Sequence, residues 1–175
     1  MTQNKALDFL PITSKEHPGH SIIYPSYEKT FPSDERREEN EFVKLYKHPK
    51  VNVFHVLEGL TSVGYVIQWD LSTVKFIEHF EVFESFRGQG YGQKILSQLK
   101  KEFSRLVLEC EPEDFSPTAK RRLEFYYRQG FTRVDISYIQ PAYSEDKKPL
   151  PLELLSSFPV EKPSSLVEEI YDVVY

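Results

Sequence analysis

The middle of the chain alternates between hydrophobic and polar positions and then changes to a helical spacing. The alternation predicts three consecutive β-strands, which cover residues 51–56, 63–69 and 74–83. The pair Glu58-Gly59 between the first two strands predicts a hairpin turn. Apolar residues then recur every three or four positions over 89–104, which predicts an amphipathic helix, and the short apolar run 106–110 predicts a buried strand.

The segments before this region predict a strand and helices. A first strand is expected at residues 6–12, and residues 22–31 are expected to form a helix or a loop. The charged run 34–39 is expected to open a helix that Pro49 ends, because proline cannot continue a helix. The charged residues would form a solvated face of that helix. Its apolar face would hold Phe42, Leu45 and Tyr46.

The C-terminal part predicts two more helices and two more strands. Ser116 followed by Pro117 is typical of a helix start, and Gly130 is typical of a helix end. The strands are expected at residues 131–139 and 150–155. A capping box from Ser165 to Glu168 precedes an apolar stripe, which predicts that a C-terminal helix, residues 165–175, docks on the domain.

The order of these elements predicts a single domain over residues 1–175, of the α/β (α+β layered) class. Its sheet is expected to be mixed, mostly antiparallel and flanked by helices. A doubly wound parallel sheet would need a helix between nearly every pair of strands, and residues 51–83 do not provide such helices.

Composition narrows the function classes. The net charge of −5 disfavours nucleic acid as a partner. The apolar runs are too short to cross a bilayer, and residues 1–5 lack the pattern of a secretory signal, so we expect a cytoplasmic protein with no membrane partner. The one cysteine, Cys110, permits no internal disulfide and no thiolate zinc site. We expect it to be a small core residue, and we expect no metal.

The loop between the third strand and the following helix is rich in glycine. It reads Arg87-Gly88-Gln89-Gly90-Tyr91-Gly92. Glycines let the backbone turn sharply and approach a ligand closely, and the free N–H groups of the next helix favour an anion such as a diphosphate. The spacing fits neither a Walker A loop nor a dinucleotide fingerprint. The sequence therefore predicts a phosphate-binding loop of another kind, with a plain structural turn as the alternative.

Two segments resemble the GNAT superfamily of N-acetyltransferases. Residues 82–92 are similar to its motif A, whose core pattern is matched by Arg87, Gly90 and Gly92. Residues 125–131, Phe-Tyr-Tyr-Arg-Gln-Gly-Phe, are similar to the signature that closes its motif B helix. The two matches occur in the order of the family. The resemblance covers residues 51–140 closely and the rest of the chain by the order of its elements.

The resemblance implies that acetyl-CoA binds as a co-substrate in a V-shaped cleft between two splayed strands. The pantetheine chain would pair with the strand backbone at Phe80, Glu81 and Val82. The pyrophosphate would lie on the N–H groups of Arg87, Gly88, Gln89, Gly90, Tyr91 and Gly92. Many members carry an asparagine near the start of the motif B helix, and this sequence has Ala119 there, next to Thr118.

The resemblance also implies an acid and a base for acetyl transfer to an amine. Tyr126 occupies the position of the tyrosine that protonates the departing thiolate, with a core tyrosine as the alternative. The base is often a glutamate on the strand before the loop, and we favour Glu78 there. Glu81 and His79 are the alternatives. A group of acids further on would favour a cationic acceptor if it lines the cleft, or else is solvated: Glu109, Glu111, Glu113 and Asp114.

The resemblance leaves hypotheses from two function classes. The first is an N-acetyltransferase that moves an acetyl group from acetyl-CoA to a primary amine of a small molecule or peptide. A different acyl donor on the same fold is a variant of it. The second is a non-catalytic CoA-binding sensor or interaction module. This second hypothesis is favoured if the hydrophobic tail helix, residues 165–175, fills the cleft.

Overall fold

The computed structural model describes residues 6–175, and the predicted absence of a signal at residues 1–5 lies outside them. The strands are β1 (Asp8–Pro11), β2 (Val51–Glu58), β3 (Thr61–Asp70), β4 (Lys75–Val82), β5 (Leu106–Cys110), β6 (Thr132–Arg133), β7 (Tyr138–Gln140) and β8 (Leu150–Ser156). The α-helices are α1 (His20–Thr30), α2 (Glu39–Phe42), α3 (Tyr91–Glu102), α4 (Pro117–Arg128) and α5 (Pro163–Val174). Short 3-10 helices are η1 (Ser33–Glu35), η2 (Val43–Lys47) and η3 (Glu84–Phe86).

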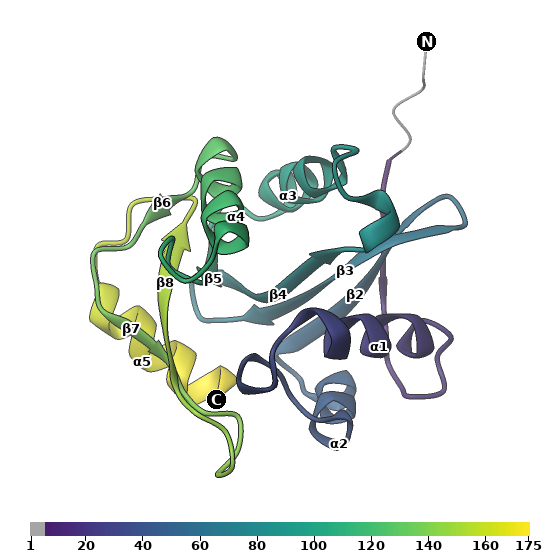
Figure 1. Ribbon diagram of the computed structural model, residues 1–175, viewed down its shortest axis with the longest axis horizontal. Helices are drawn as coiled ribbons and strands as arrows, with labels where there is room; N and C mark the ends of the chain where they lie inside the picture. The colour runs from purple at the N-terminus through teal and green to yellow at the C-terminus, as the bar shows by residue number, and fades with distance from the viewer. Residues whose placement is uncertain (1–5) are drawn as a thin grey trace.

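The strands form one mixed sheet with helices on both faces (Figure 1). Its order is β1-β2-β3-β4-β5-β8-β6, and β7 pairs with β8. Strands β4 and β5 run parallel, and the other pairs are antiparallel. The fold class predicted from the sequence is confirmed.

Each face of the sheet carries its own hydrophobic core. Helices α3 and α4 cover one face, where Ile95 and Leu99 pack with Ile77 and Leu108. Helices α1, α2 and α5 cover the other face, where Ile170 of α5 joins the core. The helices are thus held to opposite sides of the sheet, and α5 is on the side away from α3 and α4.

The sheet opens between its two parallel strands. Strand β4 pairs with β5 only from Lys75 to Ile77, opposite Leu106 to Leu108. Beyond that point β4 still pairs with β3, but a bulge interrupts the register, because Gln68 faces Ile77 whereas Ile67 faces His79. Among the described residues, no strand pairs with the other edge of β4 at 80–82. This is an open edge at the centre of the fold.

The predicted helix after residue 34 is wrong. The segment is instead broken into η1, α2 and η2, with an extended stretch at Arg36. The charged run is not a solvated face, because Glu35 and Arg37 are both buried. The backbone N–H of Arg37 donates to the hydroxyl of Tyr27 at 2.8 Å, and its side chain reaches the interior of the sheet. Burial of a charged side chain with a partner outweighs the local helical pattern.

Two further expectations near the C-terminus need correction. Residues 131–139 form two short strands, β6 and β7, because Val134 turns into the core between them. Helix α5 begins at Pro163, without a side-chain cap, so the capping box at Ser165 is wrong. Proline suits the first helical position, where its missing N–H costs nothing. The predicted start of α4 is confirmed, since Ser116 Oγ accepts from the N–H of Ala119 at 3.0 Å.

Candidate active site

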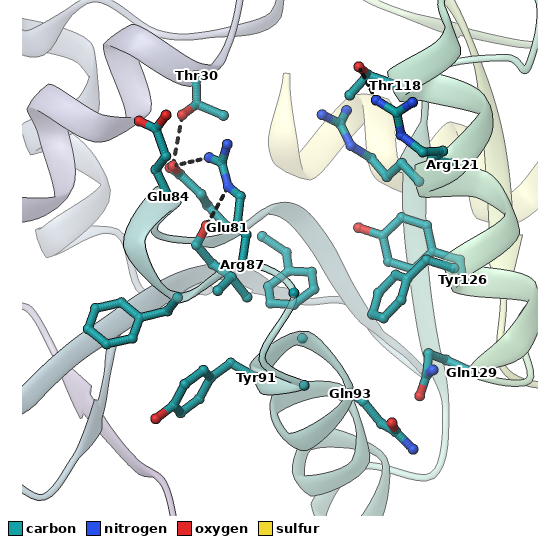
Figure 2. A pocket seen from close by; sticks show the side chains of 18 of the residues that line it. Thr30, Glu81, Glu84, Arg87, Tyr91, Gln93, Thr118, Arg121, Tyr126 and Gln129 are labelled. Atoms are coloured by element: carbon teal, nitrogen blue, oxygen red, sulfur yellow. Dashed lines mark hydrogen bonds and ion pairs between the residues drawn. The ribbon is translucent and has the colours of Figure 1, made fainter.

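A cavity of about 890 Å³ lies at the open edge of β4, between this strand and α4. Its walls come from α1, the end of β4, the glycine-rich loop with the start of α3, and one face of α4. Figure 2 shows Glu81 and Arg87 on one side of the cavity and Arg121 and Tyr126 on the other. Phe80, Glu81 and Val82 line it, as the predicted site for pantetheine would require.

The glycine-rich loop exposes the N-terminus of α3 to this cavity. Gly88 and Gly90 have φ angles of 75° and 84°, in the left-handed region that favours glycine. Gly90 is the N-cap residue of α3, so no side chain caps the first N–H groups of the helix. At Gly92 a Cβ would lie 3.1 Å from the ring of Phe125, so the helix approaches α4 closely. Uncapped N–H groups and the helix dipole favour an anion at such a terminus.

The side chains of the loop hold its shape. Arg87 donates through Nε to the carbonyl of Val82 at 3.0 Å and through Nη2 to Glu81 at 3.2 Å. Glu81 also accepts from Ser26 Oγ and Thr30 Oγ1 of α1, both at 2.8 Å. Glu81, a predicted alternative base, is thus tied into the cavity wall by three donors.

The remaining loop residues are anchored separately. The hydroxyl of Tyr91 donates to Glu58 at 2.7 Å, which ties the loop to the β2–β3 hairpin. Gln89 donates to the carbonyl of Ser85 at 2.8 Å, and its side chain is not part of the cavity wall. The loop therefore contributes its backbone, Arg87 and Tyr91 to the cavity, whereas Gln89 stabilises the conformation of the loop.

The cavity carries more positive than negative side chains, although the protein as a whole is acidic. Its cationic residues are Lys29, Arg87, Arg121, Arg122 and Arg128. Each of its two acids is paired with one of these cations: Glu81 with Arg87, and Glu84 with Lys29. Thr118 also faces the cavity, whereas Ala119 is fully buried, so Thr118 takes the exposed position at the start of α4. An excess of cations in a concave site favours a polyanionic ligand.

Sequence reasoning missed most of these cations. The run Lys120-Arg121-Arg122 at the start of the predicted helix is the signal that could have found two of them. Lys29 belongs to α1, far away in the sequence, and only the fold brings it to the loop, where its Nζ lies 3.0 Å from Glu84.

Tyr126 projects from α4 into the cavity (Figure 2). The side chain is buried, and its hydroxyl makes no hydrogen bond to another described residue. Burial raises the pKa of this phenol, so the hydroxyl is neutral and can donate a proton. The neighbouring Tyr127 is exposed and lies outside the cavity wall.

Glu78 and His79 lie on the other face of the sheet, outside the cavity wall. The Glu78 carboxylate accepts from Arg37, from Trp69 Nε1 at 2.7 Å and from the Tyr143 hydroxyl at 2.6 Å. Burial is the largest single effect and opposes ionisation, but Arg37, His79 and the two hydrogen-bond donors together outweigh it, so the pKa of Glu78 is lowered. His79 donates from Nε2 to the carbonyl of Glu35 at 2.8 Å, and burial lowers its pKa.

The acids at the end of β5 divide into two groups. Glu113 and Asp114 are exposed. Glu109 is half-buried and accepts from the hydroxyls of Tyr138 at 2.7 Å and Tyr175 at 2.6 Å, and removal of its carboxyl from water raises its pKa to about 8. Glu111 is also buried, with Oε2 3.0 Å from Arg122.

Comparison with known proteins assigns this architecture to a family. The family described as Acetyltransferase (GNAT) domain matches residues 50–133, which include the open strand, the loop and α4. Residues 50–133 form a GNAT acetyltransferase domain. The matched segment contains both sequence motifs that resemble this family. The recognition made from those motifs is confirmed.

Individual GNAT proteins support the assignment. A solved GNAT-family protein of Bacteroides thetaiotaomicron, named as a candidate acetyltransferase, is 26% identical, covers 96% of this chain and 98% of its own, and has a TM-score of 0.88. The candidate acetyltransferase YjbC of Bacillus subtilis (strain 168) is 30% identical over 109 residues, 62% of this chain. That match spans about half of YjbC, 55% of its length.

A second solved structure shows the fold with acetyl-CoA bound. It is a GNAT family acetyltransferase from Elizabethkingia anophelis with acetyl-CoA bound. It is 15% identical, covers 88% of this chain and 98% of its own, and has a TM-score of 0.57. At this identity the likeness concerns the fold.

Residues 6–175 contain neither a candidate membrane-spanning helix nor a candidate metal cluster. None of their helices combines the length and hydropathy that crossing a membrane requires. Their histidines, cysteines and acids form no group of three or more that could hold a metal ion.

Proposed function

We propose that this GNAT-family protein transfers an acetyl group from acetyl-CoA to a primary amine. One observation carries the proposal: the uncapped N-terminus of α3, behind left-handed Gly88 and Gly90, opens into a cationic cavity beside the free edge of β4. An anion site next to unpaired strand backbone suits a ligand with a pyrophosphate at one end and amides along its length.

The parts of acetyl-CoA match the parts of the cavity. The pyrophosphate lies on the backbone of Arg87 to Gly92, and the pantetheine amides pair with the edge of β4 from Phe80 to Val82. Arg121 and Arg128 of α4 face the cavity and supply charge for the remaining phosphate. The volume of about 890 Å³ falls in the range of about 300–1,000 Å³ for ligand pockets.

Acetyl transfer requires two proton movements. The amine nitrogen forms a bond to the thioester carbonyl carbon, and the C–S bond breaks with its electron pair moving to sulfur. The sulfur then takes the hydroxyl proton of Tyr126, a neutral phenol without a protein partner in the cavity wall. The amine loses one proton to a base.

The base on the strand stays a prediction, with Glu78 preferred and His79 and Glu81 as alternatives. The contacts of Glu78 support a structural role, because an ionised carboxylate with three donors and a lowered pKa is a weak base. Glu78→Gln tests the prediction. If Glu78 is the base, the variant should lose rate mainly at acidic pH, where a base is most needed to deprotonate the amine.

A CoA-binding sensor without turnover is the alternative function. It is favoured if the C-terminal helix fills the cleft. Helix α5 packs in the core on the opposite face of the sheet, and none of residues 163–174 lines the cavity. The cavity is therefore open to a ligand, and the enzyme is the better supported proposal.

Acetyl-CoA consumption with a panel of primary amines tests the proposal. We suggest butylamine, phenethylamine and glycinamide, whose groups next to the amine differ in polarity and in apolar surface. At least one of them should raise thiol release above the rate without amine. Binding of acetyl-CoA with no amine-dependent release would favour the sensor. A cytoplasmic location, a single domain over residues 1–175 and the absence of a nucleic-acid or membrane partner stay predictions.

A further inference from the structure

Two rows of side chains from α4 face the cavity. The first row holds Arg121, Phe125 and Arg128, which recur every three or four positions and so share one side of the helix. Phe125 lies close to the start of α3, because a Cβ on Gly92 would be 3.1 Å from its ring. This row therefore borders the helix terminus where the phosphates of acetyl-CoA are proposed to lie.

The second row lies beside the proposed site of transfer. It holds Thr118, Arg122 and Tyr126, which follow one another at intervals of one helical turn. Figure 2 shows Thr118 at one end of the cavity and Gln93 of α3 at the other, with Tyr126 between them. Because Arg122 comes between Thr118 and Tyr126 on the helix, it lies on the side of Tyr126 away from α3. The cofactor phosphates are proposed at the α3 end, so Arg122 faces the space left for the acceptor.

Arg122 is anchored in the cavity wall and keeps unused hydrogen-bond donors. Its Nη1 donates at 3.0 Å to Oε2 of Glu111, which is buried at the end of β5. The other N–H groups of Arg122 donate to no described residue. A guanidinium carries its N–H groups in a planar fork, which matches the two oxygens of a carboxylate. The anchored side chain is thus suited to bind a carboxylate.

Among the described residues, the cavity wall offers no free carboxylate to a second cationic group. Its acids, Glu81 and Glu84, are both held in ion pairs. The acids that would have favoured a cationic acceptor do not line the cavity: Glu109, Glu111, Glu113 and Asp114. A diamine or polyamine would therefore find no free anion in the wall for its second charge.

The end of the cavity around Arg122 keeps a positive charge. Glu111 balances Arg122, but the neighbouring Arg121 has no acid of its own. Arg121 donates through Nη2 to Thr118 Oγ1 at 3.2 Å and forms no ion pair with another described residue. A concave site with this charge attracts an anionic group and repels a second cation.

We propose that the acceptor is an amine that also carries a carboxylate, and that Arg122 binds this carboxylate. The inference rests on the proposed acetyl transfer. The amine nitrogen forms its bond to the thioester carbon beside Tyr126, and the C–S electron pair moves to sulfur. The carboxylate takes no part in these bond changes and only orients the acceptor. Glu111 is a positioning residue, because it holds the guanidinium in place.

Matched primary amines test the charge preference. We suggest butylamine with 4-aminobutanoate, pentylamine with 5-aminopentanoate, and 1,4-diaminobutane as the cationic member. Each pair shares its chain length and differs in the group at the far end. Thiol release at saturating acetyl-CoA gives kcat/KM for every amine. In at least one pair the acid should exceed the neutral amine on the order of ten- to a hundredfold, and 1,4-diaminobutane should be the poorest acceptor.

Substitutions in the two rows of α4 locate the preference. Arg122→Gln should lower kcat/KM for the preferred acid on the order of ten- to a hundredfold, with a smaller change for the matched neutral amine. Arg128→Gln, in the first row, should raise KM for acetyl-CoA and keep the preference for the acid.

A double variant guards against a loss of folding. Arg122→Gln leaves the Glu111 carboxylate buried without its cation, which destabilises a protein. Arg122→Gln with Glu111→Gln removes both charges and leaves two amides that can bond to each other. Thermal denaturation shows that this variant is folded, and it should lose the preference for the acid as the single variant does.

The outcomes distinguish the two proposals. An acid preference in the wild type that is lost in both Arg122 variants supports the inference. Equal rates within the pairs, a preference for 1,4-diaminobutane, or an acid preference that survives the loss of Arg122 overturns it and leaves acetyl transfer intact. Acetyl-CoA consumption with none of these amines and none of the earlier panel overturns both proposals.

Discussion

The guanidinium of Arg37 is paired with the carboxylate of Glu78 inside the protein. Arg37 follows η1, and Glu78 is the residue that forms the bulge of β4. Arg37 also donates to the carbonyl of Val174 at 2.9 Å, so it joins the segment after α1, the open strand and the last turn of α5. This contact holds the strand that borders the cavity.

We predict that Arg37→Met destabilises the protein strongly. Removal of the cation leaves the Glu78 carboxylate buried without its charge partner, which typically costs about 3–5 kcal/mol. Urea denaturation measures the loss. Lys44→Met is the matched control, because Lys44 pairs with Glu41 on the surface, where such pairs contribute about 0–1 kcal/mol. Equal losses of unfolding free energy in the two variants would contradict the prediction, because the buried pair would then contribute no more than the exposed one.

The same pair explains where sequence reasoning failed. A charged run followed by apolar residues favours a helix by local pattern, and nothing in residues 34–39 reveals that Arg37 has a partner forty-one positions away. In the sequence, Glu78 stands out only as a carboxylate in an apolar strand, and this pattern favours its interpretation as a base. Periodicity predicts elements well when local pattern and burial agree, as in β2, β3, β4 and α3. It fails where a long-range ion pair decides the backbone.

Only part of the candidate site could be predicted from the sequence. The loop could be predicted, because its glycines and the uncapped helix after it are local features of the chain. The position of Lys29 in the cavity could not, because it depends on how α1 folds over the sheet. The roles of Tyr126 and Glu78 stay predictions.

We predict that Tyr126→Phe lowers turnover with little change in acetyl-CoA affinity. The change removes one hydroxyl and keeps the ring, so the cavity wall is preserved while the proton donor is lost. Proton-transfer groups contribute on the order of a hundred- to ten-thousandfold in rate. Tyr127→Phe on the exposed side of the same helix is the control and should behave as the wild type. If both variants turn over at the wild-type rate, Tyr126 is a packing residue and water protonates the thiolate.

We predict that Glu109 makes the protein less stable as pH rises. Its pKa is about 8 in the folded state, against an ordinary value of 4.5. Between these values the folded state binds one more proton than the unfolded state, so the free energy of unfolding falls as pH increases. Glu109→Gln should flatten this dependence, although Glu35 contributes with the same sign.

Thermal denaturation from about pH 5 to about pH 8 measures the effect, with exposed Glu113→Gln as the control. A melting temperature that changes with pH in the same way in the wild type and in Glu109→Gln would contradict the raised pKa of Glu109.

Calorimetric titration with acetyl-CoA tests the central claim, that the cavity at the N-terminus of α3 binds this cofactor. The wild type should bind, and at a hundredfold excess over Kd the ligand should stabilise the fold by about 2.7 kcal/mol. Gly90→Glu places a charged side chain at the anion site and should abolish binding, with an unchanged circular dichroism spectrum. Gly59→Glu adds the same side chain at another left-handed glycine, in the β2–β3 turn, and should bind normally. No binding by the wild type, or equal binding by Gly90→Glu, would contradict the account.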